Sequence, residues 1–458
     1  MLNLTSFYCS QGINLYLSSV DNFFRKFNVK TSLNRSNIRK LKGVHPIVIL
    51  TYILALPFIG KNFYQGIANN HLLPFKKDVA YSFLRSEKFN WRKFLILLSV
   101  KIISFIDSLT NKSRYKVLIL DDSTIEKPRS KVVELLARVF DHANNRYLKG
   151  FRFLNLSWSD GFSFIPIDFC LLSSQKKHNR YENITKTLDK RTCGYKRRKE
   201  ALSKITDLIV PLVSRALNAG IKADYLLMDS WFGLPSIISQ LHQHINVICM
   251  LKKTSKVLYL FNGSLLTLTE IYSKLKKRRG KAHILTSTQV TLKNNLPAKI
   301  VFVRNKKNSD WLAILSTDIH LEDSEIVRLY GRRWDIEVFF KMAKQFLCLE
   351  NGTQARDFDS LIAHTSIVLL RYQFLIVEYR RQNDQRSFGA LFRACCDEMK
   401  DLTFYEALQR ILEIVGNCLK LAGEYAEEIY NQIVPHILNT AMEVFSINQK
   451  ILLNNSGT

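Results

Sequence analysis

Residues 116–124 read KVLILDDST, and residues 224–232 read DYLLMDSWF. Each stretch holds a short run of Val, Ile, Leu, Tyr or Met, which is typical of a buried β-strand, and each run is followed by aspartate. The carboxyl ends of neighbouring parallel strands meet at one edge of a sheet, so side chains at two such ends can lie close together. The two stretches therefore predict a sheet with acidic groups, Asp122 and Asp229, at one edge.

Further strands and helices lie around these two stretches. Residues 151–157 and 164–172 have the same strand-like composition, helical spacing covers 199–218 and 234–244, and another strand covers 246–251. The predicted order β-β-β-α-β-α-β indicates a mixed sheet with helices packed against it. Three strands in meander order followed by right-handed crossovers are the arrangement of a ribonuclease-H-like core, so we expect this α/β fold class.

The periodicity of apolar residues changes on both sides of this core. Residues 1–112 have apolar residues at three- and four-residue spacing and predict a helical N-terminal region. Residues 253–320 alternate apolar and polar residues, which predicts a β-rich insertion. The core would then consist of residues 113–252 and 321–380, and residues 381–458 would form a helical C-terminal region.

The composition excludes several classes of protein. A chain with 47% hydrophobic residues can bury a large core, which excludes wholesale disorder. The excess of 67 Lys and Arg over 39 Asp and Glu gives a formal net charge of +28, which favours a polyanionic partner. The longest apolar run, residues 47–59, is shorter than the ~20 residues of a spanning helix, so we expect no membrane partner.

The N-terminus and the cysteines favour the cytosol. The first residues have no basic segment ahead of an apolar one, so we expect no secretory signal and a cytoplasmic protein. The eight cysteines are scattered, with neither a CxxC pair nor zinc-site spacing, and we expect reduced thiols.

Residues 330–344 read YGRRWDIEVFFKMAK. This stretch contains four polar residues at spacings of three, four and seven: Tyr330, Arg333, Glu337 and Lys344. On an α-helix they fall within an arc of about 60°, and most of the apolar residues fall on the other side. The stretch therefore predicts a helix that packs on the sheet and presents its polar groups together. An ordinary amphipathic surface helix with one Arg–Glu pair would have the same pattern.

The four residues reproduce the Y-(2)-R-(3)-E-(6)-K signature of DDE insertion-sequence transposases, and the chain resembles that family over residues 113–375. Two strand-end aspartates, a β-rich insertion and then the glutamate helix are in the family's order. The DDST context resembles the family's pattern of an acidic residue before Asp-Ser or Asp-Thr, which selects Asp122 over Asp121 as the ligand. Asp229 is selected by its strand position, because the two residues after it differ from those of many relatives.

The resemblance implies metal-dependent cleavage and strand transfer at the ends of an insertion sequence. The implied catalytic residues and metal ligands are Asp122, Asp229 and Glu337, which would bind two Mg²⁺ ions, with Mn²⁺ as a substitute. Oxygen ligands without His or Cys suit these ions, and two metals can activate the attacking oxygen and stabilise the leaving oxygen. The implied contacts with the DNA end are Tyr330, Arg333 and Lys344. The resemblance also implies a homodimer that holds two element ends, with the helices of residues 381–458 as its dimerisation region; a plain capping subdomain is the alternative for these helices.

Basic clusters lie inside and beside the predicted catalytic domain. One lies within residues 176–200 and another within 274–281, and we expect both to bind the backbone of duplex DNA. The expected contacts are Lys196, Arg197, Arg198, Lys276, Lys277, Arg278 and Arg279. A third cluster, within residues 30–42, belongs to the N-terminal region, to which we assign recognition of the element end. Each cluster alone could equally be a solvated face.

Other functions fit parts of the pattern. A metal nuclease without strand transfer would need the same acids. A catalytically inactive DNA-binding relative would keep the fold and the charge, but all three acids and the Tyr, Arg and Lys are present. A basic membrane-surface protein is disfavoured because no basic amphipathic helix stands out. We therefore expect a transposase that binds terminal inverted repeats and target DNA in the cytoplasm, at the nucleoid.

Overall fold

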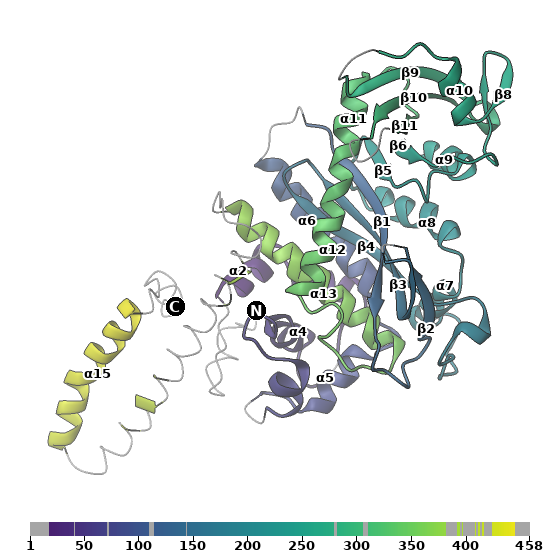
Figure 1. The fold of residues 1–458 in the computed structure, drawn as a ribbon. Helices are drawn as coiled ribbons and strands as arrows, with labels where there is room; N and C mark the ends of the chain where they lie inside the picture. The colour runs from purple at the N-terminus through teal and green to yellow at the C-terminus, as the bar shows by residue number, and fades with distance from the viewer. Residues whose placement is uncertain are drawn as a thin grey trace. The chain divides into compact units, whose positions relative to one another are not determined.

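The structure is a computed structural model. It describes residues 18–40, 42–70, 73–109, 114–142, 144–278, 282–305, 310–381, 392–393, 396, 408, 411–412, 415 and 424–444. The chain forms two compact units (Figure 1). The first consists of Met1–Asn34, Arg39–Leu84 and Arg381–Thr458, and the second of Arg35–Ile38 and Arg85–Arg380.

The described elements of the first unit are helical. They are α2 (Ser18–Lys26), α3 (Val29–Arg35, which ends at the boundary), α4 (Pro46–Ala55), a π-helical turn η1 (Tyr64–Ala68), α5 (Lys77–Leu84) and α15 (Glu424–Val444). The helix predicted from the apolar run at residues 47–58 is confirmed by α4. Its start is fixed by Pro46 at the first position and by His45, whose ring accepts a hydrogen bond from the backbone of Ile47.

The second unit is built on an 11-stranded mixed sheet, in the order β2-β3-β1-β5-β6-β11-β10-β9-β7-β8, with β4 paired to β3. The strands are β1 (Val117–Glu126), β2 (Ala137–Asp141), β3 (Arg146–Ser159), β4 (Phe164–Leu172), β5 (Tyr225–Met228), β6 (Asn246–Leu251), β7 (Tyr259–Phe261), β8 (Ser264–Leu266), β9 (Ile284–Thr291), β10 (Pro297–Arg304) and β11 (Trp311–Ser316). β1 pairs antiparallel with β3 and parallel with β5, and β5 pairs parallel with β6. This confirms the predicted α/β class with ribonuclease-H-like connections.

The segment predicted as a β-rich insertion is continuous with this sheet. β11 pairs antiparallel with β6, with Ala313 opposite Leu251, and β10 and β9 follow outward. Within this segment α10 (Leu268–Lys274) was not predicted, although Thr267 and Glu270 form a capping box at its start.

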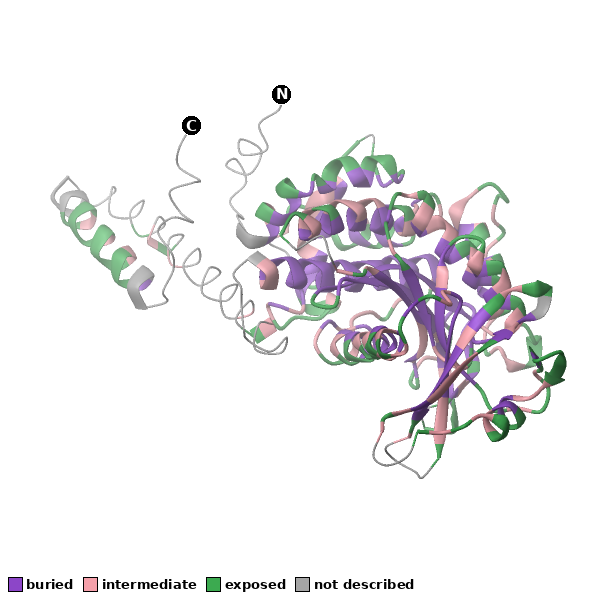
Figure 2. Cartoon of the chain, turned by 90° about the horizontal axis from the view of Figure 1, so that it is seen from above, coloured by how far each residue is buried: buried purple, intermediate pink, exposed green. Residues whose placement is uncertain are grey.

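Helices cover both sides of the buried strands (Figure 2). They are α6 (Trp91–Ser108), α7 (Cys193–Ala201), α8 (Ile205–Asn218), α9 (Pro235–His242), α11 (Asp323–Gly331), α12 (Asp335–Gln345) and α13 (Phe358–Arg381). Alternate residues of β1 face opposite sides of the sheet. On one side Phe340 of α12 packs on Phe153, the β3 partner of Ser123. On the other side Arg92 of α6 and Arg215 of α8 bind Asp168.

Two predicted helices are each split in two. Residues 199–218 contain the end of α7 and all of α8, and residues 323–347 contain α11, a 3₁₀ turn over Arg332–Trp334 and α12. Gly331, a poor helix former, ends α11 at the second break.

α13 is long and apolar enough, by length and composition, to cross a membrane. Its whole apolar window is buried within the chain, as in the core helix of a folded domain.

Candidate active site

The two adjacent aspartates lie inside β1 rather than after it. The strand continues to Glu126, because it pairs with β3 along its whole length. Side chains alternate along a strand, so Asp121 and Asp122 face opposite sides of the sheet. Asp229 directly follows β5 and is half-buried, as its strand-end position predicted.

Arg333 brings Asp121 together with Glu337. Its guanidinium donates to Asp121 Oδ2 at 2.6 Å and to Glu337 Oε1 at 2.9 Å. Arg333 itself is only 5% exposed, because the 3₁₀ turn between α11 and α12 directs it to the sheet. Asp122 was predicted to lie beside Glu337, but the residue on that side is Asp121. Asp122 faces the other side, where its Oδ2 lies 2.9 Å from Arg152 Nε.

The acids of this edge repel one another. Burial raises the pKa of Asp121 to about 7; Arg333 opposes that shift, and the charges of Asp122 and Asp229 add to it. Burial also raises the pKa of Asp122 to about 6, with Arg152 opposing and Asp229 adding. Asp229 is therefore close enough for its charge to raise the pKa of both Asp121 and Asp122. We call Asp121, Asp122, Asp229 and Glu337 the acidic edge; Arg152 and Arg333 contact three of these four acids, namely Asp121, Asp122 and Glu337.

The acidic edge has the donor atoms of a metal site but not its compact grouping. Among the residues that the structure describes, no three His, Cys, Asp or Glu side chains are grouped closely enough to hold a metal ion. Arg333 lies between Asp121 and Glu337 in this arrangement. The donors are nevertheless all carboxylate oxygens, and a divalent cation would offset the burial and the repulsion that raise the pKa values of Asp121 and Asp122. The donor set therefore fits Mg²⁺ or Mn²⁺.

The remaining residues of the signature do not form one exposed stripe. Tyr330 is 5% exposed, and its hydroxyl has no hydrogen-bond partner in the described part of the chain. Its ring centre lies 6.0 Å from the Arg333 guanidinium. Lys344 Nζ lies 3.3 Å from Glu350 Oε1. Arg333 contacts Glu337 and lies beside Tyr330, as expected for one shared side of the helix, but Tyr330 and Arg333 are buried and a 3₁₀ turn interrupts the helix at Arg332–Trp334.

A hollow of about 460 Å³ opens beside the acidic edge. Its lining includes the cations of Arg152, Lys204 and Lys252 and the indole of Trp231. Trp231 is 42% exposed; its ring centre lies 4.6 Å from that of His142 and 5.2 Å from Lys252 Nζ. The sequence analysis did not single out these residues. The sequence signal for this hollow was Trp231, an aromatic residue two positions after the strand-end Asp229.

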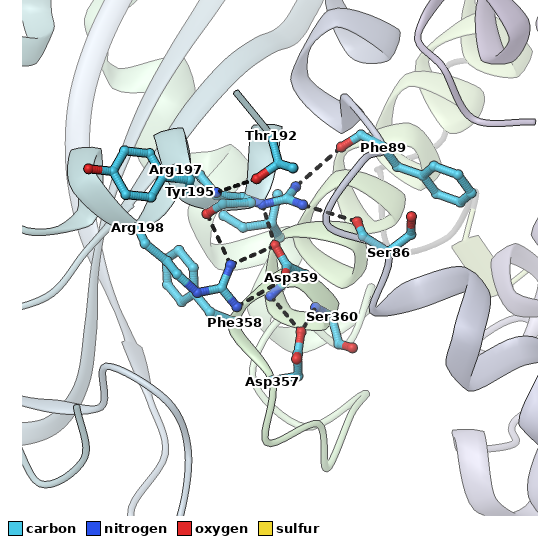
Figure 3. Close-up of polar contacts among 12 residues, drawn as sticks. Ser86, Phe89, Thr192, Tyr195, Arg197, Arg198, Asp357, Phe358, Asp359 and Ser360 are labelled. Atoms are coloured by element: carbon cyan, nitrogen blue, oxygen red, sulfur yellow. Dashed lines mark hydrogen bonds and ion pairs between the residues drawn. The ribbon is translucent and has the colours of Figure 1, made fainter. Parts of the chain in front are cut away.

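Two of the expected DNA contacts are buried instead (Figure 3). Arg197 and Arg198 are 7% and 2% exposed. Arg198 donates to Glu134 at 2.7 Å and to Asp359 at 2.9 Å, and Arg197 Nε lies 2.5 Å from Asp359. The expectation that these two arginines bind DNA is therefore corrected: their charges are neutralised inside the protein. The signal was the i, i+3, i+4, i+7 spacing of the buried face of α7, namely Gly194, Arg197, Arg198 and Ala201.

The other basic residues differ in exposure. Lys196, Lys276 and Arg278 are exposed. Lys277 is partly buried, with Nζ 3.1 Å from the Ser273 carbonyl and 4.8 Å from the Tyr272 ring centre. Arg279 lies outside the described residues. Lys196, Lys276 and Arg278 therefore have side chains accessible to a DNA backbone.

Comparison with known families covers the region that holds the acidic edge. Residues 64–287 match the model of the DDE superfamily endonucleases, and residues 201–374 match the model of the transposase DDE domain. The first match includes Asp121 and Asp122, the second includes Glu337, and both include Asp229. None of the curated proteins compared with the chain matches it. On these two matches and on its mixed sheet, the chain belongs to the DDE transposase family.

Proposed function

We propose that the protein is a transposase that binds the two ends of an insertion sequence, cuts the DNA there and joins the ends to a target. The observation that carries this proposal is the Arg333 bridge, which joins Asp121 of β1 to Glu337 of α12 beside the acid that follows β5. Buried acids that repel one another are costly to a fold, so they indicate a site that serves a ligand.

We further propose that the three catalytic acids are Asp121, Asp229 and Glu337. Asp121 is favoured over Asp122 because it lies on the side of the sheet that faces Glu337. Asp122, which the sequence resemblance favoured, would then hold Arg152, which lines the hollow. This assignment keeps the order of acids along the chain.

The acidic edge would hold two Mg²⁺ ions, or Mn²⁺ in their place. When bound, such ions activate the attacking oxygen and stabilise the leaving oxygen of a phosphodiester. The chain's own groups would exclude water around Asp121, through burial, and hold Glu337 in place through Arg333. The Tyr330 hydroxyl, buried without a partner in the described residues, would be available to the DNA end.

The DNA would enter through the hollow beside the acidic edge. Arg152, Lys204 and Lys252 provide charge for backbone phosphates, and Trp231 provides a stacking surface for a base. The more distant backbone contacts would come from the exposed Lys196, Lys276 and Arg278, and Lys344 would hold a phosphate near the end. Two protomers would act as a homodimer on terminal repeats and target DNA, in the cytoplasm at the nucleoid.

The decisive experiment incubates the full chain and Mg²⁺ with a plasmid that carries the element between its inverted repeats. Cleaved and joined products are expected. Cleavage without joining would indicate the metal nuclease, and DNA binding without cleavage would indicate an inactive relative. The DNA on both sides of the reading frame would supply these inverted repeats.

Asp121→Asn and Asp122→Asn are a matched pair for the assignment of the first acid. We expect Asp121→Asn to lower the cleavage rate by about 10³-fold, because loss of a metal ligand removes several kcal/mol of transition-state stabilisation. Asp122→Asn should lower it far less. The reverse ranking would return the role to Asp122, and intact cleavage in both would remove β1 from the site.

A further inference from the structure

A second hollow, of about 320 Å³, lies within the second unit, where three segments meet. The segments are residues 35–37, 88–93 and 191–193. Backbone contacts hold them together: the amide of Asn90 donates to the Ser36 carbonyl at 3.0 Å, and the amide of Gly194 donates to the Glu87 carbonyl at 2.8 Å. The hollow is therefore part of the folded unit and not a gap between loops.

Four cations from these three segments converge on the hollow. Arg35, Lys88, Lys93 and Arg191 line it, and no Asp or Glu does. Arg191 pairs with Asp189 at 2.8 Å while its side chain stays 90% exposed. No acidic partner is recorded for Arg35, Lys88 or Lys93 within the described part of the chain. Like charges brought together in this way repel unless an anion lies among them.

The uncharged groups of the hollow also suit an anion. α6 begins after Asn90 and α7 after Thr192, and both caps line the hollow, so two helix N-termini contribute partial positive charge. Ser36 lines it as well; the residue is 1% exposed, and its hydroxyl has no hydrogen-bond partner among the described residues. A buried hydroxyl without a partner is unfavourable, and an anion oxygen would accept its proton in a hydrogen bond.

We propose that this hollow, the phosphate hollow lined by Arg35, Ser36, Lys88, Lys93 and Arg191, binds a backbone phosphate of duplex DNA. The choice of DNA as the source of the phosphate rests on the proposed function. Two basic clusters that are far apart in sequence, within residues 30–42 and 176–200, each send one arginine into it. The contact is with phosphate alone, so it fixes the position of the duplex and does not read its sequence.

The test measures binding of the full chain to a random-sequence duplex by fluorescence anisotropy, in EDTA and from about 50 to about 200 mM salt. The variant is Lys88→Gln with Lys93→Gln. We expect about tenfold weaker binding at the lowest salt and a slope of log affinity against log salt that is smaller by about 1, for the one lost phosphate contact. An unchanged slope would overturn the proposal.

The matched control is Lys222→Gln with Lys256→Gln. Both lysines are exposed and lie outside the hollow, and the control removes the same net charge. The control should keep the wild-type slope. If it loses as much affinity as Lys88→Gln with Lys93→Gln, the effect belongs to the total charge of the protein, and the phosphate hollow is not a site.

Inorganic phosphate distinguishes the two sources of the ligand. Thermal unfolding is followed with and without it at constant ionic strength. If phosphate stabilises the wild type but not Lys88→Gln with Lys93→Gln, while DNA binding is the same in both, the hollow binds a small anion and the DNA proposal fails. Loss of both effects in the variant supports a phosphate site that DNA uses.

Ser36→Ala separates a role in DNA binding from a role in stability. Removing an unpartnered buried hydroxyl should leave the midpoint of thermal unfolding unchanged or raise it. It should also weaken DNA binding by roughly threefold, through the lost hydrogen bond. Because binding is measured in EDTA, failure of cleavage in the wild type would break the proposed function and leave the hollow intact. Active cleavage with an unchanged salt slope would overturn the phosphate hollow and leave the proposed function intact.

Discussion

Buried arginines bind carboxylates in several regions of the second unit, and two of these regions differ in charge balance. In the arginine cluster, Arg197 and Arg198 face two acids, Glu134 and Asp359. At the acidic edge, Arg152 and Arg333 face four acids, two of which have pKa values raised to about 6 and about 7. One region is neutral as it stands, and the other has more negative than positive groups.

The difference separates a structural group from a functional one. A buried ion pair with equal charges needs nothing from outside, and its role is to fix the segments that it joins. A buried excess of carboxylates is unfavourable in the free protein and is relieved when cations bind. The arginine cluster should therefore lose stability when an acid is removed, and the acidic edge should gain it.

Asp359→Ala should have the largest effect on stability. It leaves Arg197 and Arg198 buried with one acid between them, and breaking a buried pair costs about 3–5 kcal/mol. Chemical denaturation followed by circular dichroism measures the free energy of unfolding. The control is Asp189→Ala, which removes an exposed acid that also pairs with an arginine. Equal unfolding midpoints for the two variants would contradict a structural role for the cluster.

Asp121→Asn should have the opposite effect on stability and make the folded protein more stable. A raised pKa means that the folded protein holds a proton which the unfolded chain releases, so stability is lost as the pH rises from about 4 to about 7. Asparagine removes that loss. We expect the variant to be more stable than the wild type by up to about 3 kcal/mol at pH 8 in EDTA. The gain is limited because Arg333 loses a partner in the variant. The gain should vanish near pH 4; a variant less stable than the wild type at pH 8 would show that the edge is not strained.

The sequence predicted most of the strands, but it did not predict β2, and β1 and β3 are longer than predicted. β6 and most of β5 lie where apolar runs predicted them, because burial on both faces leaves a clear pattern. β1 was expected to end at Asp121, since aspartate is rare in strands. β1 continues to Glu126 because it pairs with β3 along its whole length, from Val117 opposite Ser159 to Glu126 opposite Gly150. Tertiary pairing decided that end, and local composition does not record it.

The site was predictable as a set of residue types and not as a set of contacts. Asp229 and Glu337 were predicted from position and spacing, and their catalytic role stays a prediction. The choice between Asp121 and Asp122 depends on which face of the sheet α12 covers, and only the fold supplies that. Arg198 was taken for a DNA contact because its partners, Glu134 and Asp359, lie 64 and 161 residues away. A charge run in the sequence does not indicate how much of it is neutralised inside.

Divalent cations should stabilise the acidic edge, which has an excess of acids, and not the arginine cluster, which is neutral. If Mg²⁺ binds the acidic edge, its addition at about 100 times the dissociation constant should stabilise the folded protein by about 2.7 kcal/mol. Thermal unfolding in Mg²⁺ and in EDTA at equal ionic strength measures the difference. Asp121→Asn and Asp229→Asn should lose it, and Asp189→Asn, in an exposed pair, should keep it. The same stabilisation in all of them would place the cation elsewhere.

The smallest predicted effect concerns Trp231 in the hollow beside the acidic edge. A stacked base contributes about 1–3 kcal/mol, so Trp231→Ala should weaken binding to a single-stranded element end by roughly tenfold. Stability should change little, because the side chain is 42% exposed. Phe162→Ala is the control, since Phe162 is also exposed and lies 3.9 Å from an arginine, Arg114, but does not line the hollow. Trp231→Phe should restore binding in part, because phenylalanine keeps a stacking face. If Trp231→Ala and Phe162→Ala bind equally, the hollow receives phosphate only. The acidic edge would then differ from the arginine cluster in its charge but not in having an opening for a base.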